Sequence, residues 1–452
     1  MIFTLPASPS RRLPCIISGD PHYTTFDGKR YDFQGPCTYV LSQQCDSDLP
    51  SYRVEGSNEH RGSSATWTRL VKVFVYNETI ELVKGHRGEA KVNGIFATTP
   101  FSLTNGAVHV YTSGFSIGVS TDFGLEVSYD AHHLVNIKVP SSYQGATCGL
   151  CGNFNNDPDD DIQPPEGDIV SPLDLSHSWL VPNADESECM PCEGQDCSHC
   201  SEDERALFNN PDNCGILRDR SGPFAACHEV LSPESFVYNC VYDLCSEGGQ
   251  QDILCLALNV YASQCQEKGV QLQTWRSPGF CEIICPENSH FEPQSTGCPA
   301  TCVNPESHND CALAPLESCA CNEGYVLSGA DCVPLHECGC NFEGLYYHSG
   351  QTSIQKATCI ISGDPHYTTF DGKRYDFQGP CTYVLSQQCD SDLPSYRVEG
   401  SNEHRGSSAT WTRLVKVFVY NETIELVKGH RGEAKVCSYN FKSTQQNQVL
   451  IY

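Results

Sequence analysis

Cysteine is the residue that most constrains how this chain can fold. The 452 residues include 29 cysteines, a density that is seldom kept as free thiols in a reducing compartment. We therefore expect disulfides, rather than one large apolar core, to supply much of the stability. The same density predicts passage through the secretory pathway and a secreted, extracellular location.

The charge of the chain narrows the choice of partners. With 56 acidic and 28 basic residues, the formal net charge is −28. Binding to nucleic acid is disfavoured, because phosphate contacts need clustered lysine and arginine. An acidic surface suits calcium or cationic partners, although ordinary solubility explains most of it.

The chain offers neither a membrane span nor a conventional leader. No stretch reaches the roughly 20 apolar residues that cross a bilayer. Residues 1–14 contain only a short apolar run, and Arg11 and Arg12 lie on its wrong side for a signal peptide. We therefore expect a non-native N-terminus on a fragment of a longer protein.

A long repeat sets the domain organisation. Residues 15–92 recur without a single change as residues 359–436. A period of this length is not a solenoid repeat and indicates a multi-domain unit that begins again, by recent duplication or by one exon joined twice. We expect residues 359–436 to form a partial domain with exposed strand edges. Residues 437–452 show no strand alternation and are predicted to be an aberrant tail.

The first unit has the pattern of an all-β domain over residues 15–182. Apolar and polar residues alternate over 71–75, 123–129 and 135–139, and glycine, asparagine, aspartate or proline closes each run. This period of two predicts half-buried strands. We expect two antiparallel sheets packed as a β-sandwich.

Two motifs at opposite ends of this domain carry a family resemblance. Residues 19–28 read GDPHYTTFDG, and residues 148–154 read CGLCGNF. The domain resembles the von Willebrand factor type D domain, which gel-forming mucins, tectorins, zonadhesins and IgG Fc-binding proteins share. The resemblance extends over both copies of the repeat.

Two small cysteine-rich domains are expected to follow. Residues 189–281 resemble an eight-cysteine domain, in which Ser232 caps a helix over 234–245 and a second helix covers 251–265. Residues 285–338 resemble a trypsin-inhibitor-like domain with fewer cysteines than that family usually carries. Residues 339–358 are expected to be a linker.

The family resemblance also implies disulfide pairings: Cys15 with Cys151, Cys45 with Cys148, and Cys37 with Cys189. The second copy repeats three of these cysteines without their partners, which explains why the total number of cysteines, 29, is odd. Cys148 and Cys151 have the spacing of a redox pair, but Gly152 and a polar loop follow them rather than the helix that lowers a thiol pKa. We therefore favour two structural bridges.

An acidic loop after Cys151 is a candidate calcium site. Calcium binds six to eight oxygen ligands on a bendable loop. Asn153, Asn155, Asp160 and Asp161 offer such oxygens, and the Cys15–Cys151 bridge would bring Asp27 beside them. The alternative is a solvated turn, since asparagine and aspartate dominate turns. The resemblance to calcium sites of the family favours calcium.

The Gly-Asp-Pro-His step is a candidate site of self-cleavage. An aspartate carboxylate can attack its own peptide carbonyl, and the nitrogen of a following proline leaves readily, above all if a histidine protonates it. Similar motifs in the family cleave themselves, and the alternative is a turn before a strand. The candidate residues in the two copies are Asp20, Pro21 and His22, and Asp364, Pro365 and His366.

The resemblance implies a secreted extracellular-matrix or mucus-type glycoprotein that is stabilised by calcium and assembles through its type D modules. The expected partners are other extracellular glycoproteins or mucins, with self-association as a further expectation. Asn77 and Asn421 lie in the two glycosylation sequons. The alternatives are a serine protease inhibitor, through residues 285–338, and a self-cleaving module. Motifs of conventional enzymes are absent, so an enzyme with an external substrate is not expected.

Overall fold

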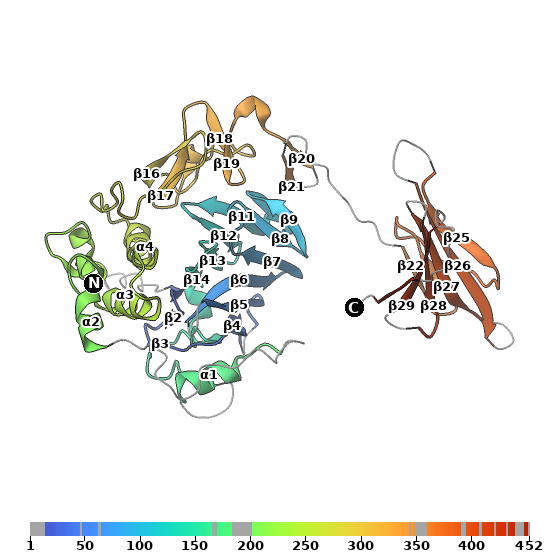
Figure 1. The fold of residues 1–452 in the computed structure, drawn as a ribbon, viewed down its shortest axis with the longest axis horizontal. Coiled ribbons are helices and arrows are strands. Elements are labelled where there is room, and N and C mark those ends of the chain that lie inside the picture. Colours follow the sequence, from blue (N-terminus) through green and yellow to red (C-terminus); the bar gives the residue numbers. More distant parts are fainter. Residues whose placement is uncertain are drawn as a thin grey trace, which may run out of the picture. The chain divides into compact units, whose positions relative to one another are not determined.

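The computed structural model describes residues 14–45, 48–61, 65–164, 170–182, 201–342, 345–348, 359–389, 395–405, 409–419, 422–430, 433–438 and 447–450. The chain divides into two compact units, Met1–Thr352 and Ser353–Tyr452. In Figure 1 the colours run from blue through orange over the first unit, and from orange to red over the second.

Two antiparallel sheets form the type D domain of the first unit. The eight-stranded sheet has the order β10 (Phe101–Leu103), β11 (Val108–Ser113), β12 (Ser116–Thr121), β13 (Glu126–Tyr129), β14 (Val135–Lys138), β1 (Cys15–Ser18), β2 (His22–Thr24) and β3 (Arg30–Asp32). The nine-stranded sheet has the order β15 (Thr147–Cys148), β4 (Thr38–Gln44), β5 (Tyr52–Arg61), β6 (Ala65–Val75), β7 (Glu78–Val83), β8 (Glu89–Val92), β9 (Ile95–Thr98), β21 (Leu345–Tyr347) and β20 (Cys340–Phe342).

Both sheets turn an apolar face toward one shared core. Val71 and Val73 of β6 are buried in the same hydrophobic cluster as Val127 of β13 and Ile137 of β14. Successive side chains of a strand point to opposite faces, so the predicted period of two places alternate residues in this core. The expected antiparallel sandwich is confirmed. The helix α1 (Pro172–Ser178) adds Leu175 to the core.

Three helices form the eight-cysteine domain: α2 (Glu202–Phe208), α3 (Glu234–Ser246) and α4 (Gln251–Glu267). Both predicted helices are present, but the predicted cap is wrong. The Val237 amide donates to the Pro233 carbonyl at 2.9 Å, and this first intrahelical bond makes Pro233, not Ser232, the N-cap. Within the part of this domain that the structure describes, disulfides join the helices and loops at Cys214–Cys240, Cys227–Cys265 and Cys255–Cys281.

The helix α4 packs against the type D sandwich as well as its own domain. Gln264 donates to Asn136 of β14 at 2.9 Å, and Lys138 pairs with Glu267 at 2.8 Å. Leu254, Leu258 and Tyr261 of α4 are all buried, as the predicted helical face requires. The eight-cysteine domain is therefore docked on the eight-stranded sheet through polar contacts at the end of α4.

The trypsin-inhibitor-like domain has two short hairpins and four disulfides. Strand β16 (Ser289–Ser295) pairs with β17 (Leu316–Cys321), and β18 (Tyr325–Ser328) pairs with β19 (Asp331–Pro334). The disulfides are Cys285–Cys319, Cys298–Cys311, Cys302–Cys338 and Cys321–Cys332. The Trp275 indole donates to Glu317 of β17 at 2.7 Å, so one edge of this domain is used in contact with the preceding one.

The predicted linker over residues 339–358 is in part a hairpin. Strands β20 and β21 pair with each other, and Tyr346 pairs with Thr98 of β9 at the edge of the nine-stranded sheet. The ring of Tyr346 is buried, and its hydroxyl lies 3.1 Å from that of Ser328. The linker prediction was wrong here because backbone pairing needs no alternating pattern, and a single buried tyrosine fixes the register.

The second unit repeats the early strands of the type D domain. One sheet contains β22 (Ile360–Ser362), β23 (His366–Thr368) and β24 (Arg374–Asp376). The other contains β25 (Thr382–Gln387), β26 (Tyr396–Arg405), β27 (Ala409–Val419), β28 (Glu422–Val427), β29 (Glu433–Ser438) and β30 (Asn447–Leu450). Part of the predicted aberrant tail is thus a strand, because β30 pairs with β29 and satisfies the backbone groups of that edge.

Candidate functional site

Two disulfides join the beginning of the sandwich to its acidic loop. Cys15 is bonded to Cys151, and Cys45 is bonded to Cys148. These are the two pairings that the resemblance implied, and they place Cys148 and Cys151 in separate bridges. Cys37 is also disulfide-bonded, but its expected partner, Cys189, lies outside the described residues.

Several cysteines of the described residues are free thiols, and they include the copies of Cys15, Cys37 and Cys45 in the second unit. The free thiols are Cys340, Cys359, Cys381 and Cys389. The second copy therefore keeps the strands of the first without the bridges that close the sandwich.

The acidic loop lies against the turn that carries Asp27. The Phe26 amide donates to the Cys151 carbonyl at 3.1 Å. The carboxylate of Asp27 then accepts the backbone N–H groups of Asn155 and Asn156, both at 2.9 Å. A side chain from the beginning of the domain is thus held at a loop more than a hundred residues later.

The remaining candidate calcium ligands lie in contact with one another. The side-chain amides of Asn153 and Asn155 donate to the two oxygens of Asp160, at 3.1 and 2.7 Å. Asp161 accepts the Asn153 backbone N–H at 3.2 Å. All five predicted positions, including Asp27, therefore meet at one end of the sandwich.

The electrostatics of this loop favour a cation. Asp161 is 2% exposed, and burial, followed by the nearby charges of Asp27 and Asp160, raises its pKa to about 6. The Thr25 hydroxyl donates to Asp161, whereas Lys29 pairs with Asp159 instead. Carboxylate and amide oxygens are the ligand types that a hard divalent cation such as calcium prefers.

The Gly-Asp-Pro-His step forms the turn between β1 and β2. Gly19 has φ +65°, and a Cβ at this position would lie 2.5 Å from a carboxylate oxygen of Asp243 in α3. Only glycine permits both this left-handed conformation and the close approach. The turn is therefore covered by the eight-cysteine domain.

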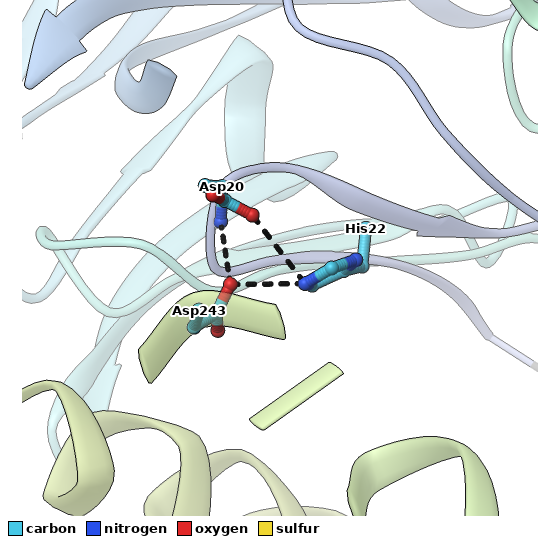
Figure 2. A group of neighbouring side chains, drawn as sticks. All are labelled: Asp20, His22 and Asp243. Carbon is cyan, nitrogen blue, oxygen red and sulfur yellow. Dashed lines mark hydrogen bonds and ion pairs between the residues drawn. The ribbon is translucent and has the colours of Figure 1, made fainter. Parts of the chain in front are cut away.

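His22 lies among three carboxylates, and Figure 2 shows two of them, those of Asp20 and Asp243. Its Nδ1 is 2.8 Å from Asp32, and its Nε2 is 2.9 Å from Asp243 and 3.5 Å from Asp20. Burial lowers the pKa of His22, but the charges and hydrogen bonds of Asp243 and Asp32 outweigh it and raise the pKa well above its usual value. The raised pKa keeps the imidazole protonated over a wider pH range than in a free histidine.

Asp20 is more deeply buried than His22 or Asp243. It is 1% exposed, and neither of its carboxylate oxygens has a hydrogen-bond partner among the described residues. Burial and then the charge of Asp243 raise its pKa well above the usual value. A poorly solvated carboxyl group next to a peptide carbonyl is a reactive arrangement.

The carbonyl of the Asp20-Pro21 bond has a hydrogen-bond donor. The side-chain amide of Gln34 donates to the Asp20 carbonyl at 2.7 Å. The Gln34 oxygen accepts from the backbone and hydroxyl of Thr66, at 2.9 and 3.1 Å, which fixes the orientation of the amide. A fixed donor at this carbonyl stabilises the negative charge that develops when the carbonyl is attacked.

The second copy has the same turn in a different environment. His366 is 3.2 Å from Asp364 and 2.7 Å from Asp376, and Gln378 donates to the Asp364 carbonyl. However, His366 is 59% exposed and Asp364 is 45% exposed, and no described residue takes the place of Asp243. Pro365 thus follows a solvated rather than a buried aspartate.

Sequence reasoning missed Asp32, Gln34 and Asp243. The first two lie on and just after β3, where only the β2–β3 register shows that Asp32 is opposite His22. Asp243 comes from a helix in another domain, and no local pattern marks it.

Of the two sequons, Asn77 lies at the exposed tip of the β6–β7 hairpin with φ 65°, and its glycosylation stays a prediction. Asn421 lies outside the described residues.

Comparisons with known proteins agree with this domain order. The family model of the von Willebrand factor type D domain matches residues 15–168 and 359–451, that of the C8 domain matches residues 213–282, and that of the trypsin inhibitor like cysteine rich domain matches residues 285–338. The chain belongs to the family of proteins built from von Willebrand factor type D domains.

Its relatives are large proteins. IgGFc-binding protein of Homo sapiens and alpha-tectorin of Mus musculus are each 36% identical over 93% of this chain, and zonadhesin of Sus scrofa is 36% identical over 91%. The chain spans 9%, 22% and 19% of these three relatives, respectively. Within the part of the chain that the structure describes, no helix has both the length and the apolarity to cross a bilayer.

Proposed function

We propose that this chain acts as a secreted structural and binding glycoprotein that assembles through its type D modules. The observation that carries the proposal is the covalent framework, in which nine disulfides between described residues cross-link the D, C8 and inhibitor-like domains internally. Such a framework persists only in an oxidising compartment. Its partners would be other extracellular glycoproteins or mucins, or a second copy of the chain.

Thiol titration of the exported protein tests this proposal. We expect the cysteines of the nine disulfides to resist a thiol reagent in the folded protein and to react only after reduction. Light scattering with and without reductant then measures self-association. A folded, monomeric protein in which most cysteines react freely would contradict the proposal.

We further propose that calcium binds the acidic loop. Asp27, Asn153, Asn155, Asp160 and Asp161 would hold the ion, which would neutralise carboxylates that repel one another in its absence. The support is the convergence of these oxygens and the raised pKa of the buried Asp161. The ion would stabilise the turn of Asp27 against the loop after Cys151.

A thermal shift measures this stabilisation. At a calcium concentration one hundred times the dissociation constant, binding adds about 2.7 kcal/mol, which raises Tm by about 5 to 10 °C for a domain of this size. EDTA should reverse the increase, and Asp160→Asn should remove most of it. Asp159→Asn is the matched control, because its side chain is 91% exposed in the same loop. Equal calcium responses of the two variants would refute the site.

Self-cleavage at Asp20-Pro21 is a second candidate function, and the contact between Gln34 and the scissile carbonyl favours it. A carboxylate oxygen of Asp20 attacks the Asp20 carbonyl carbon and forms a cyclic anhydride as the C–N bond breaks. The protonated His22 gives its proton to the Pro21 nitrogen, which leaves as an amine. Water then opens the anhydride to two carboxyl groups. The products are a chain that ends at Asp20 and one that begins at Pro21.

A further inference from the structure

The two copies of the Gly-Asp-Pro-His turn form a natural comparison within one molecule. Residues 15–92 and 359–436 are identical, and both copies keep the aspartate that holds Nδ1 of the histidine and the glutamine at the scissile carbonyl. A difference in reactivity must therefore come from outside the repeated sequence.

One contribution from outside the repeated sequence is α3 of the C8 domain, which contacts the turn directly. Asp243 lies 2.9 Å from Nε2 of His22, and its oxygen also accepts the Asp20 backbone N–H at 3.4 Å. The neighbouring Tyr242 packs edge-on against the His22 ring, with centroids 5.4 Å apart. This helical turn contacts Asp20 and His22, which are both buried, whereas their counterparts in the second copy are exposed.

We infer that docking of the C8 domain activates the Asp20-Pro21 bond, with Asp243 as the positioning residue. The inference rests on the proposed self-cleavage. It assigns to the C8 domain a control over the backbone of the preceding domain. Because Asp364 and His366 are exposed, we expect the Asp364-Pro365 bond to be cleaved more slowly.

Three physical effects link Asp243 to the reaction. Its negative charge keeps His22 protonated, because an opposite charge within about 4 to 6 Å favours the charged imidazole. Its hydrogen bond to the Asp20 N–H fixes the backbone of the attacking residue. Its helix excludes water, which strengthens the electrostatic contacts inside the site. Asp243 itself neither gains nor loses a proton in the balanced reaction.

Cleavage of the Asp20-Pro21 and Asp364-Pro365 bonds can be compared in one sample. The full chain is folded, incubated, reduced and analysed by mass spectrometry for fragments that begin at Pro21 or Pro365. We expect the Pro21 fragment to accumulate and the Pro365 fragment to stay at least about tenfold lower, since loss of the partner charge alone shifts a pKa by about one to three units.

Asp243→Asn tests the positioning residue. We expect Pro21 formation on the high-pH side to slow by about tenfold or more, and that limb of the rate profile to move to lower pH by about one to three pH units, because His22 loses a partner charge. The acidic limb should move to lower pH as well, because Asp20 loses a neighbouring negative charge. The groups that face His22 are Asp20, Asp32, Asp243 and Tyr242, and the other three remain. Glu234→Gln, an exposed change on the same helix, is the control and should leave the rate unchanged.

The outcomes separate this inference from the proposal on which it rests. Equal cleavage at Pro21 and Pro365, or a rate and pH profile unaffected by Asp243→Asn, overturns the role of the C8 domain but leaves self-cleavage intact. A variant that is slow with an unmoved pH profile also overturns it, because a merely structural defect has that signature. Absence of both fragments from the wild-type chain overturns self-cleavage and the inference together.

Discussion

Replacing His22 with glutamine is expected to slow cleavage of the Asp20-Pro21 bond by about 10²- to 10⁴-fold, the usual contribution of a positioned acid. Glutamine is near in size to histidine and retains a hydrogen-bonding side chain toward Asp32 and Asp243. It cannot deliver a proton to the leaving nitrogen of Pro21. The rate is the fraction of chains that begin at Pro21, measured after reduction at fixed times.

The pKa shifts of His22 and Asp20 determine the pH profile that we expect for the wild-type reaction. His22 must be protonated, and its raised pKa extends the active range above the ordinary value of 6.5. Asp20 must be ionised, and its raised pKa moves the acidic limb above the ordinary value of 3.8. The rate should therefore fall on both sides, with each limb at higher pH than for the isolated groups.

An exposed histidine of the same domain supplies the control for this substitution. His109→Gln on β11 changes a solvent-exposed ring that contacts Ser102 and should leave the rate unaltered. If His22→Gln cleaves at the wild-type rate, the imidazole is not the acid, and the proposed reaction fails.

Removal of the Cys15–Cys151 bridge is expected to cost about 5 kcal/mol, because this disulfide spans 136 residues and restricts the unfolded chain accordingly. The variant is Cys15→Ser with Cys151→Ser. The loss should appear as a large fall in the Tm of the type D domain in a calorimetric scan. The calcium-dependent increase in Tm should shrink as well, because the bridge holds the Asp27 turn at the acidic loop.

A short-range bridge is the matched control. Cys321→Ser with Cys332→Ser removes a disulfide that spans 11 residues, for which the same chain-entropy argument gives about 3 kcal/mol. This change should leave the calcium response of the type D domain intact. An equal loss of that response in both double variants would show that the Cys15–Cys151 bridge does not order the acidic loop.

Much of the sandwich could be predicted because its signals are local. Alternation over 71–75 and 135–139 marks strands directly, and the predicted helix over 251–265 is present as α4 for the same reason. The hairpin of β20 and β21 and the strand β30 could not be predicted in this way. Each adds to a sheet edge through backbone hydrogen bonds, which leave little trace in the side-chain pattern.

The residues of the candidate sites also differ in whether local sequence signals could predict them. The oxygens of the acidic loop lie close together in sequence, and one implied disulfide was enough to add Asp27. Asp20, Pro21 and His22 are adjacent in sequence and stood out at once. Asp243 is more than two hundred residues away, and its approach depends on how α4 and β14 fix the C8 domain against the sandwich. Such a contact is a property of packed domains.

The position of β1 has a consequence for the fate of a nicked molecule. This strand lies between β14 and β2 within the eight-stranded sheet, and its first residue is the bridged Cys15. A break after Asp20 would leave the segment that ends at Asp20 hydrogen-bonded on both sides and tethered through sulfur. The nick would therefore not separate the two parts of the chain, and it would stay invisible on a non-reducing gel until a reductant breaks the disulfide.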